Sequence, residues 1–202
     1  MFKILCVADF ESYEGDDFLK RIQLLCKAGV DEILLRAKGL SEANFYDLAR
    51  VVAQICENYR KNFIINQFFD VSCRLKSDFW LTSAQLEFFK NHGVFLEEFR
   101  KTAKIYAPAH DIEQAKISAS IADVLVASHI FATSCKPNLE PKGVSFISEL
   151  KSFNKEIYAL GGLDGGNYKE AIKAGASGIC FMSLAMIGDM ELVKKIAESK
   201  NG

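Results

Sequence analysis

The chain has 202 residues, of which half are hydrophobic and a quarter are charged, and its formal net charge is −1. This balance is typical of a globular protein, and without a basic excess the sequence offers no electrostatic surface for nucleic acid. No apolar run approaches the length of about 20 residues that a membrane helix needs. The first residues, "MFKILCVADFESYEGDD", meet acidic positions too early for a secretory signal. We therefore expect neither a nucleic-acid partner nor a membrane partner.

The six cysteines and three histidines show no metal-binding spacing. The cysteines form no CxxC pair, and most of them lie in apolar runs, as reduced and buried thiols do. The histidines form no HxH or HxxxH pair and have no nearby cysteine, so a zinc site is not expected. These features predict a cytoplasmic protein without a bound metal.

Short apolar segments alternate with longer amphipathic ones along the whole chain. The short segments are apolar on both faces and bounded by turn or charged residues, which is the pattern of buried parallel strands. Helical patterns between them begin at plausible capping residues, Ser41 and Asp111, and one ends at Gly29. The expected strands are residues 3–8, 32–37, 62–66, 79–82, 104–109, 123–128, 156–160 and 178–183.

Eight strands alternating with helices predict an α/β fold, a (β/α)8 TIM barrel, at the short end of the length range for that fold. The alternative is a doubly wound open sheet of about five or six strands, and the strand count favours the barrel. No linker or composition break interrupts the chain, so residues 1–202 are expected to form a single domain.

The stretch "YALGGLDGG" at residues 158–166 places four glycines directly after the seventh expected strand. Glycines there serve either a tight turn or a close approach of backbone amides to a phosphate. Barrels commonly bind phosphate in the loops after strands 7 and 8. We therefore predict a phosphate site made by Gly161 and Gly162 together with Met182 and Ser183, which close the eighth expected strand.

The other expected strand ends carry an unusual number of polar side chains. Singly, each is accounted for as a solvated or turn-forming loop residue. Together they form a cationic, hydrogen-bonding set suited to a small anionic substrate. The candidates for substrate binding are Arg36, Lys38, Asn66, His129, Thr133 and Lys136, and His110 follows strand 5.

These segments resemble the superfamily of thiamine phosphate synthases and thiazole tautomerases, which are (β/α)8 barrels. "LLRAK" is similar to the family's "QLREK", "IINQ" to "IIND", "APAHDIEQA" to "GVSAHSLEEA", and "YALGGL" to "IAIGGI". The resemblance is weak before residue 60 and strong from residue 104 onward. It implies a small phosphorylated heterocycle, a thiazole phosphate, as the ligand, and it leaves a homodimeric state open.

Three positions depart from the synthase pattern. Synthases use Mg²⁺ to neutralise the pyrophosphate leaving group, and two aspartates hold that ion. One of these aspartates is replaced by Gln67, and only Ala84, Gln85 and Leu86 stand near the second. The serine that contacts pyrophosphate is replaced by Pro108. We therefore expect no cofactor and no catalytic Mg²⁺, which would be needed only in the synthase alternative.

The loop after strand 6 reads "SHIFATSCK", closer to the tautomerases' "GHVFETDCK" than to the synthases' "GPVFPTSTK". This resemblance implies a thiazole tautomerase-like isomerase in which His110 moves a proton on a carboxythiazole phosphate, with His129 as the fallback acid–base residue. Imidazole suits that role near neutral pH. Two alternatives stay open: a divergent thiamine phosphate synthase, and a non-catalytic barrel that binds a thiazole or thiamine phosphate as a regulatory protein.

Overall fold

The structure is a computed structural model of the chain, and it describes residues 1–13, 17–134 and 136–201. Eight parallel strands form a closed barrel in chain order, so the predicted (β/α)8 fold is confirmed and the open sheet is excluded. The strands are β1 (Lys3–Asp9), β2 (Glu32–Arg36), β3 (Asn62–Asn66), β4 (Asp78–Trp80), β5 (Ile105–Ala109), β6 (Val124–Ser128), β7 (Glu156–Leu160) and β8 (Gly178–Phe181).

All eight predicted strands are present, and their side chains explain why the sequence indicated them. β5 and β6 are buried at every position, which is what parallel strands covered on both faces require. β4 spans Asp78–Trp80 rather than residues 79–82, and β8 ends at Phe181 rather than at Ser183. The apolar run continues past the strand into a short helix, and periodicity alone does not mark that change.

Helices alternate with these strands, and the predicted caps form. Ser41 accepts a hydrogen bond from the amide of Asn44 (3.3 Å), and Asp111 accepts one from the amide of Gln114 (2.7 Å). Gly29 follows the first helix with φ of 96°, a conformation that favours glycine. The helices are α1 (Phe18–Lys27), α2 (Glu42–Asn58), α3 (Phe69–Leu75), α4 (Leu86–Asn91), α5 (Gly93–Phe99), α6 (Ile112–Ile121), α7 (Gly143–Leu150), α8 (Tyr168–Ala174), α9 (Ser183–Ile187) and α10 (Met190–Glu198).

Contacts divide the chain into two compact units. The first contains residues 1, 3–80 and 181–202, and the second contains residues 2 and 81–180. The single domain expected over residues 1–202 stays a prediction. In the part of the chain that the structure describes, no helix combines the length and apolar character needed to cross a membrane.

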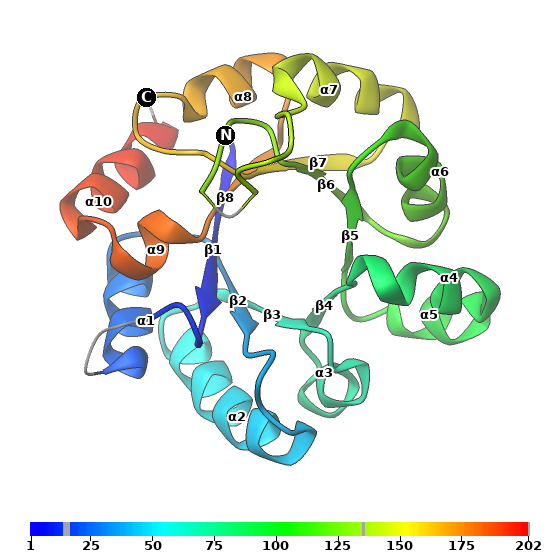
Figure 1. Cartoon of the computed structure of the whole chain (residues 1–202). Coiled ribbons are helices and arrows are strands. Elements are labelled where there is room, and N and C mark those ends of the chain that lie inside the picture. The colour runs from blue at the N-terminus through cyan, green and yellow to red at the C-terminus, as the bar shows by residue number, and fades with distance from the viewer. Residues whose placement is uncertain (14–16, 135, 202) are drawn as a thin grey trace. The chain divides into compact units, whose positions relative to one another are not determined.

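In the first unit, β1 to β4 pair in order, and Figure 1 shows α1 and α2 outside these strands. Arg21 on α1 fixes α9, because its guanidinium donates to the carbonyls of Ala185 (2.6 Å) and Gly188 (2.7 Å). Those carbonyls lie at a helix end, where intrahelical donors are lacking. Burial of this guanidinium lowers the pKa of Arg21.

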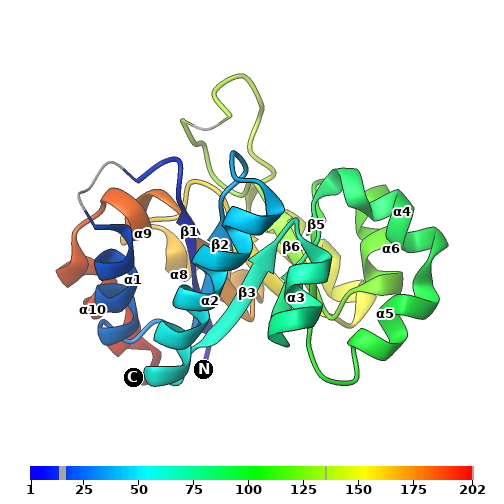
Figure 2. The same ribbon diagram turned by 90° about the horizontal axis from the view of Figure 1, so that it is seen from below.

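In the second unit, β5, β6 and β7 pair in order, and the rings of Tyr106 and Tyr158 pack edge to face with centroids 5.7 Å apart. Both rings are fully buried, and Gly178 lies so close to Tyr158 that a Cβ there would be 2.6 Å from its Cζ. Figure 2 shows the chain between β6 and α7 as a long loop that extends beyond the ends of β5 and β6. That loop carries several predicted site residues.

Candidate functional site

Arg36 lies at the carboxyl end of β2, where substrates bind in barrels of this kind. Its Nη1 donates to Oδ1 of Asp9, its register partner at the end of β1. The Asp9 side chain is 5% exposed, whereas the Arg36 side chain is 28% exposed. A guanidinium has five N–H donors, so a contact through Nη1 leaves Nε and Nη2 able to bind an anion. The structure thus holds one predicted site residue in place through a partner that the sequence did not single out.

The other predicted residues of the first unit differ in how firmly they are held. Lys38 is exposed, in a loop that is tied down by a hydrogen bond from the Gly39 amide to Oε1 of Glu11 (2.7 Å). Asn66 is buried at the end of β3 and donates from Nδ2 to the Trp80 carbonyl (3.3 Å). This bond uses one of the two amide protons of Asn66. Arg36, Lys38 and Asn66 therefore provide donors at the ends of two neighbouring strands.

The predicted strand-end positions for Mg²⁺ lack carboxylates. Gln67 adopts a left-handed conformation with φ of 72°, and its amide cannot supply the negative charge that a hard cation prefers. After β4, Oε1 of Gln85 accepts from both the amide (3.1 Å) and the hydroxyl (3.0 Å) of Thr82. Among the described residues, no group of three or more His, Cys, Asp or Glu could hold a metal ion. The residues present do not fit the magnesium site of the synthases, and the absence of a bound metal stays a prediction.

His110 lies directly after β5 and is positioned through both its backbone and its ring. Its amide donates to Oε1 of Gln114 (2.9 Å), and Nδ1 lies 2.9 Å from the Ser128 carbonyl at the end of β6. Because a carbonyl only accepts, Nδ1 carries the proton and Nε2 is the basic nitrogen of the neutral ring. Burial lowers the pKa of His110; the bond to Ser128 opposes this shift, and the ammonium groups of Lys136 and Lys142 reinforce it.

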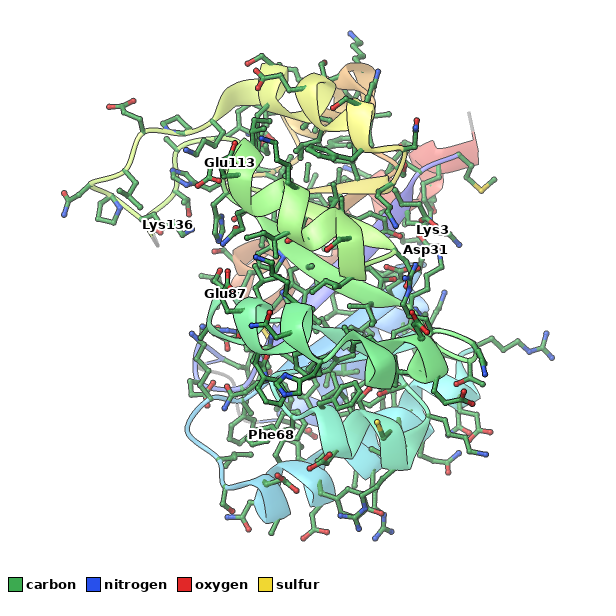
Figure 3. The ribbon with its side chains drawn as sticks, turned by 90° about the vertical axis from the view of Figure 1, so that its right-hand side faces the viewer. Lys3, Asp31, Phe68, Glu87, Glu113 and Lys136 are labelled. Atoms are coloured by element: carbon green, nitrogen blue, oxygen red, sulfur yellow. The ribbon has the colours of Figure 1, made fainter. Side chains whose placement is uncertain are left out.

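His129 begins the loop after β6, and its ring lies within that loop. The side chain is buried (4% exposed), and its Nε2 donates to the Leu139 carbonyl (3.1 Å). Thr133 and Lys136 lie farther along, where the Lys136 amide donates to the Thr133 carbonyl (3.1 Å) in a turn. Figure 3 shows Lys136 on this loop, at the left of the view. Cys135, which matched the tautomerase pattern, lies outside the described residues.

Gly161 and Gly162 follow β7 and both have positive φ, of 98° and 66°. A Cβ at Gly161 would be 2.3 Å from the Cβ of His129, and a Cβ at Gly162 would be 2.4 Å from the Ala132 carbonyl oxygen. The loop after β6 therefore packs directly against these glycines. This packing requires residues without side chains irrespective of any phosphate, so the glycines alone do not identify an anion site.

The remaining predicted phosphate residues lie in the first unit. Ser183 is the first residue of α9, and Met182 precedes it rather than ending the strand. The second unit contains His110, His129, Thr133, Lys136, Gly161 and Gly162, and the first contains Arg36, Lys38, Asn66, Met182 and Ser183. Within the second unit the structure joins His129 to Gly161 and His110 to Ser128; the phosphate-binding role of the glycines stays a prediction.

Three positioning contacts escaped sequence reasoning. Asp9 pairs with Arg36, and Gln114 and Ser128 hold His110. The signal for Asp9 was its place at the end of the first apolar strand. The side chain of Gln114 accepts from the amide of His110, the residue just before the Asp111 cap, and no local sequence pattern indicated this bond.

Comparison with known proteins agrees with this fold and extends over nearly the whole chain. The family model described as "Thiamine monophosphate synthase" matches residues 4–185. A thiamine-phosphate synthase of Fusobacterium nucleatum is 30% identical over 184 residues, covering 90% of this chain and 87% of that protein. A thiamine-phosphate synthase of Caldanaerobacter subterraneus is 25% identical over 194 residues, covering 94% and 89%.

Among solved structures, the thiamine phosphate pyrophosphorylase from Pyrococcus furiosus aligns over 100% of this chain and 98% of its own, with a TM-score of 0.81. At 20% sequence identity this likeness supports the fold alone.

The comparisons correct the predicted activity. The family and these relatives are named for the synthase, so the thiazole tautomerase-like isomerase prediction is wrong and its synthase alternative is the one supported. That prediction had rested on the loop "SHIFATSCK" and on three departures from the synthase pattern, whereas the similarity to synthases extends along the chain. Since the family model covers most of the 202 residues, the chain belongs to the thiamine monophosphate synthase family.

Proposed function

We propose that the chain is a thiamine-phosphate synthase, a transferase that joins a pyrimidine pyrophosphate to a thiazole phosphate. In this reaction a bond forms between the thiazole and the pyrimidine's side-chain carbon as the bond from that carbon to pyrophosphate breaks. The family match over residues 4–185 carries the proposal. The relatives named as synthases are similar in length to this chain, which supports assigning the activity to the whole chain.

The pyrophosphate end of the reaction is assigned to the first unit. As the leaving group departs, negative charge grows on its oxygens, and fixed cations that face this charge lower the barrier. Arg36, held by Asp9, supplies a guanidinium able to bind phosphate oxygens in pairs, and Lys38 adds a second charge. Asn66 adds a neutral amide donor near them.

The family resemblance tied Mg²⁺ to the synthase alternative, but Gln67 and Gln85 do not supply the carboxylates that would hold the ion. The proposal therefore departs from the synthase pattern here and assigns the charge stabilisation to Arg36 and Lys38, with no step through a metal.

The thiazole phosphate is assigned to the second unit. Its phosphate is expected to accept hydrogen bonds from the amides of Gly161 and Gly162 and from Thr133, with Lys136 balancing the charge. Met182 and Ser183 belong to the first unit, and their phosphate-binding role stays a prediction from the sequence. His110, neutral near pH 7 because burial lowers its pKa, is a candidate for contacting a substrate ring through Nε2. Joining the two substrates needs no proton shuttle, so an acid–base role is not retained for it.

The cellular location and the partners of the protein also belong to this proposal. The thiols of Cys6, Cys26, Cys56, Cys73 and Cys180 are free, which supports a cytoplasmic location. A homodimer remains a prediction of the resemblance, and neither nucleic acid nor a membrane is expected as a partner.

The proposal is tested by incubating the purified protein with a pyrimidine pyrophosphate and a thiazole phosphate and measuring thiamine phosphate by chromatography. Arg36→Gln should lower the rate by about 10²-fold, because it removes one charge-stabilising group. Arg50→Gln is the matched control, since Arg50 is an exposed residue of α2 in the same unit. Wild-type protein that binds both substrates without forming product would instead indicate a binding protein.

A further inference from the structure

The loop after β6 carries two residues assigned to the thiazole phosphate, Thr133 and Lys136, and its base is closed by backbone hydrogen bonds. The amide of Lys142 donates to the His129 carbonyl (2.9 Å), and the amide of Gly143 donates to the Ile130 carbonyl (3.0 Å). These bonds hold the first and last residues of the loop next to each other. They fix its base but do not by themselves fix the segment around Lys136.

The ring of His129 adds a bond that reaches across the loop. Its Nε2 donates to the carbonyl of Leu139, ten positions along the chain and three after Lys136. The Leu139 amide in turn donates to the Lys136 carbonyl (3.3 Å). The buried imidazole therefore connects the start of the loop to the turn that carries the ammonium group.

The two residues after His129 bond to the glycine loop that follows β7, and the Cβ of His129 packs against the same loop. The amides of Ile130 and Phe131 donate to the carbonyls of Leu160 and Gly161, each at 3.0 Å. The Cβ of His129 lies where any side chain on Gly161 would collide with it. His129 thus contacts both loops that the proposed function assigns to one phosphate.

We propose that His129 is a positioning residue, which locks the loop bearing Thr133 and Lys136 against the Gly161 loop so that both meet the thiazole phosphate in a fixed geometry. The identity of the ligand in this inference rests on the proposed function. The locking of the loop by His129 does not, because it concerns the protein without any ligand. It replaces the earlier prediction that the His129 ring itself binds substrate. The effect on the reaction passes through Lys136.

The first experiment measures amide hydrogen exchange without any ligand, comparing wild type with His129→Phe. Phenylalanine keeps the ring volume and removes the donor to Leu139. Exchange at Leu139, Lys142 and Gly143 should become about tenfold faster, the effect expected when one buried hydrogen bond is lost. His129→Gln should restore slow exchange, because its amide can donate from a place close to that of Nε2. His92→Phe is the matched control, since His92 is an exposed histidine in the same unit.

The second experiment separates positioning from substrate contact through steady-state kinetics. His129→Phe should raise the KM for thiazole phosphate about tenfold and change kcat less than about twofold, since the loop holds the phosphate and not the reacting bond. In a Lys136→Met background the same change should raise KM less than about twofold, because two residues acting through one contact are not additive.

Three results would overturn the inference: unchanged exchange in His129→Phe, no rescue by His129→Gln, or a full tenfold effect on KM in the Lys136→Met background. The last would show that the imidazole contacts substrate directly. If the wild-type protein neither binds thiazole phosphate nor forms product, the proposed function fails, whereas the exchange measurement still decides whether His129 locks the loop.

Discussion

Asp9 at the end of β1 and Arg36 at the end of β2 are register partners that form an ion pair, with the carboxylate buried and the guanidinium partly exposed. A buried carboxylate is retained only when it is paired or well hydrogen-bonded. The pair therefore fixes the orientation of the Arg36 guanidinium at the carboxyl ends of the strands, where substrates bind in such barrels. A guanidinium held in this way can bind an anion without first being ordered.

Asp9→Asn should destabilise the protein by about 1–3 kcal/mol, the usual loss for a buried hydrogen bond to a charged group. The cost stays at this level because Arg36 is partly solvated and keeps water as a partner. Urea denaturation measures the free energy of unfolding. Asp47→Asn, at an exposed position on α2, should change it by less than about 0.5 kcal/mol; equal values for the two variants would contradict the structural role of Asp9.

Gly161→Ala should cost about 3 kcal/mol or more, because a methyl group there combines an unfavourable positive φ with a collision against His129. Gly143→Ala isolates the first effect. Gly143 also has a positive φ (70°), but a Cβ there would lie 3.9 Å from its nearest neighbour, so about 1–2 kcal/mol is expected. If denaturation gives similar losses for both variants, the close approach of the two loops is not as described.

The prediction for pH follows from His110. Its pKa in the folded state lies below the ordinary value of 6.5 because burial disfavours the charged ring. The unfolded chain therefore takes up the proton first, so the stabilising contribution is present above about pH 6.5 and is lost as the pH falls through the folded pKa. Between pH 7.5 and 5.5, wild type should lose more stability than His110→Gln. A wild type that becomes relatively more stable at pH 5.5 would reverse the sign and refute the prediction.

Magnesium provides a further prediction, because Gln67 replaces one expected ligand and Gln85 near the second is engaged with Thr82. Isothermal titration of Mg²⁺ into the protein alone should show no saturable binding. Gln67→Asp should not create a site, since a single carboxylate leaves most of the coordination of the ion to water. Saturable binding to wild type at millimolar Mg²⁺ or below would show that other residues supply the site.

The short strands, apolar on both faces and separated by helical patterns, indicated an α/β fold with a parallel sheet, and the count of eight strands favoured the barrel over a doubly wound sheet. The sequence placed the end of β8 too late because the run "GICFMSLAMI" stays apolar from strand into helix. It also predicted Arg36 and Lys38 as site cations from their place after a strand. It could not pair Asp9 with Arg36, since that contact depends on the register of two strands.

The glycines show where local sequence stops being informative. Both a phosphate and a closely packed loop require residues without side chains, so Gly161 and Gly162 fit either explanation until the neighbouring loop is located. The predicted activity was likewise limited by reliance on a short stretch of sequence. The loop "SHIFATSCK" favoured a tautomerase, although similarity along the chain favours the synthases. A few matching side chains in one loop carry less information than the whole barrel.

The central claim is that this chain forms thiamine phosphate, and phosphorus NMR of one reaction mixture tests it most directly. Wild-type protein with both substrates should produce thiamine phosphate and pyrophosphate in equal amounts, and neither should form when one substrate is omitted. Thiazole phosphate that binds but stays unchanged beside intact pyrimidine pyrophosphate would contradict the account and identify the chain as a binding protein of the same family.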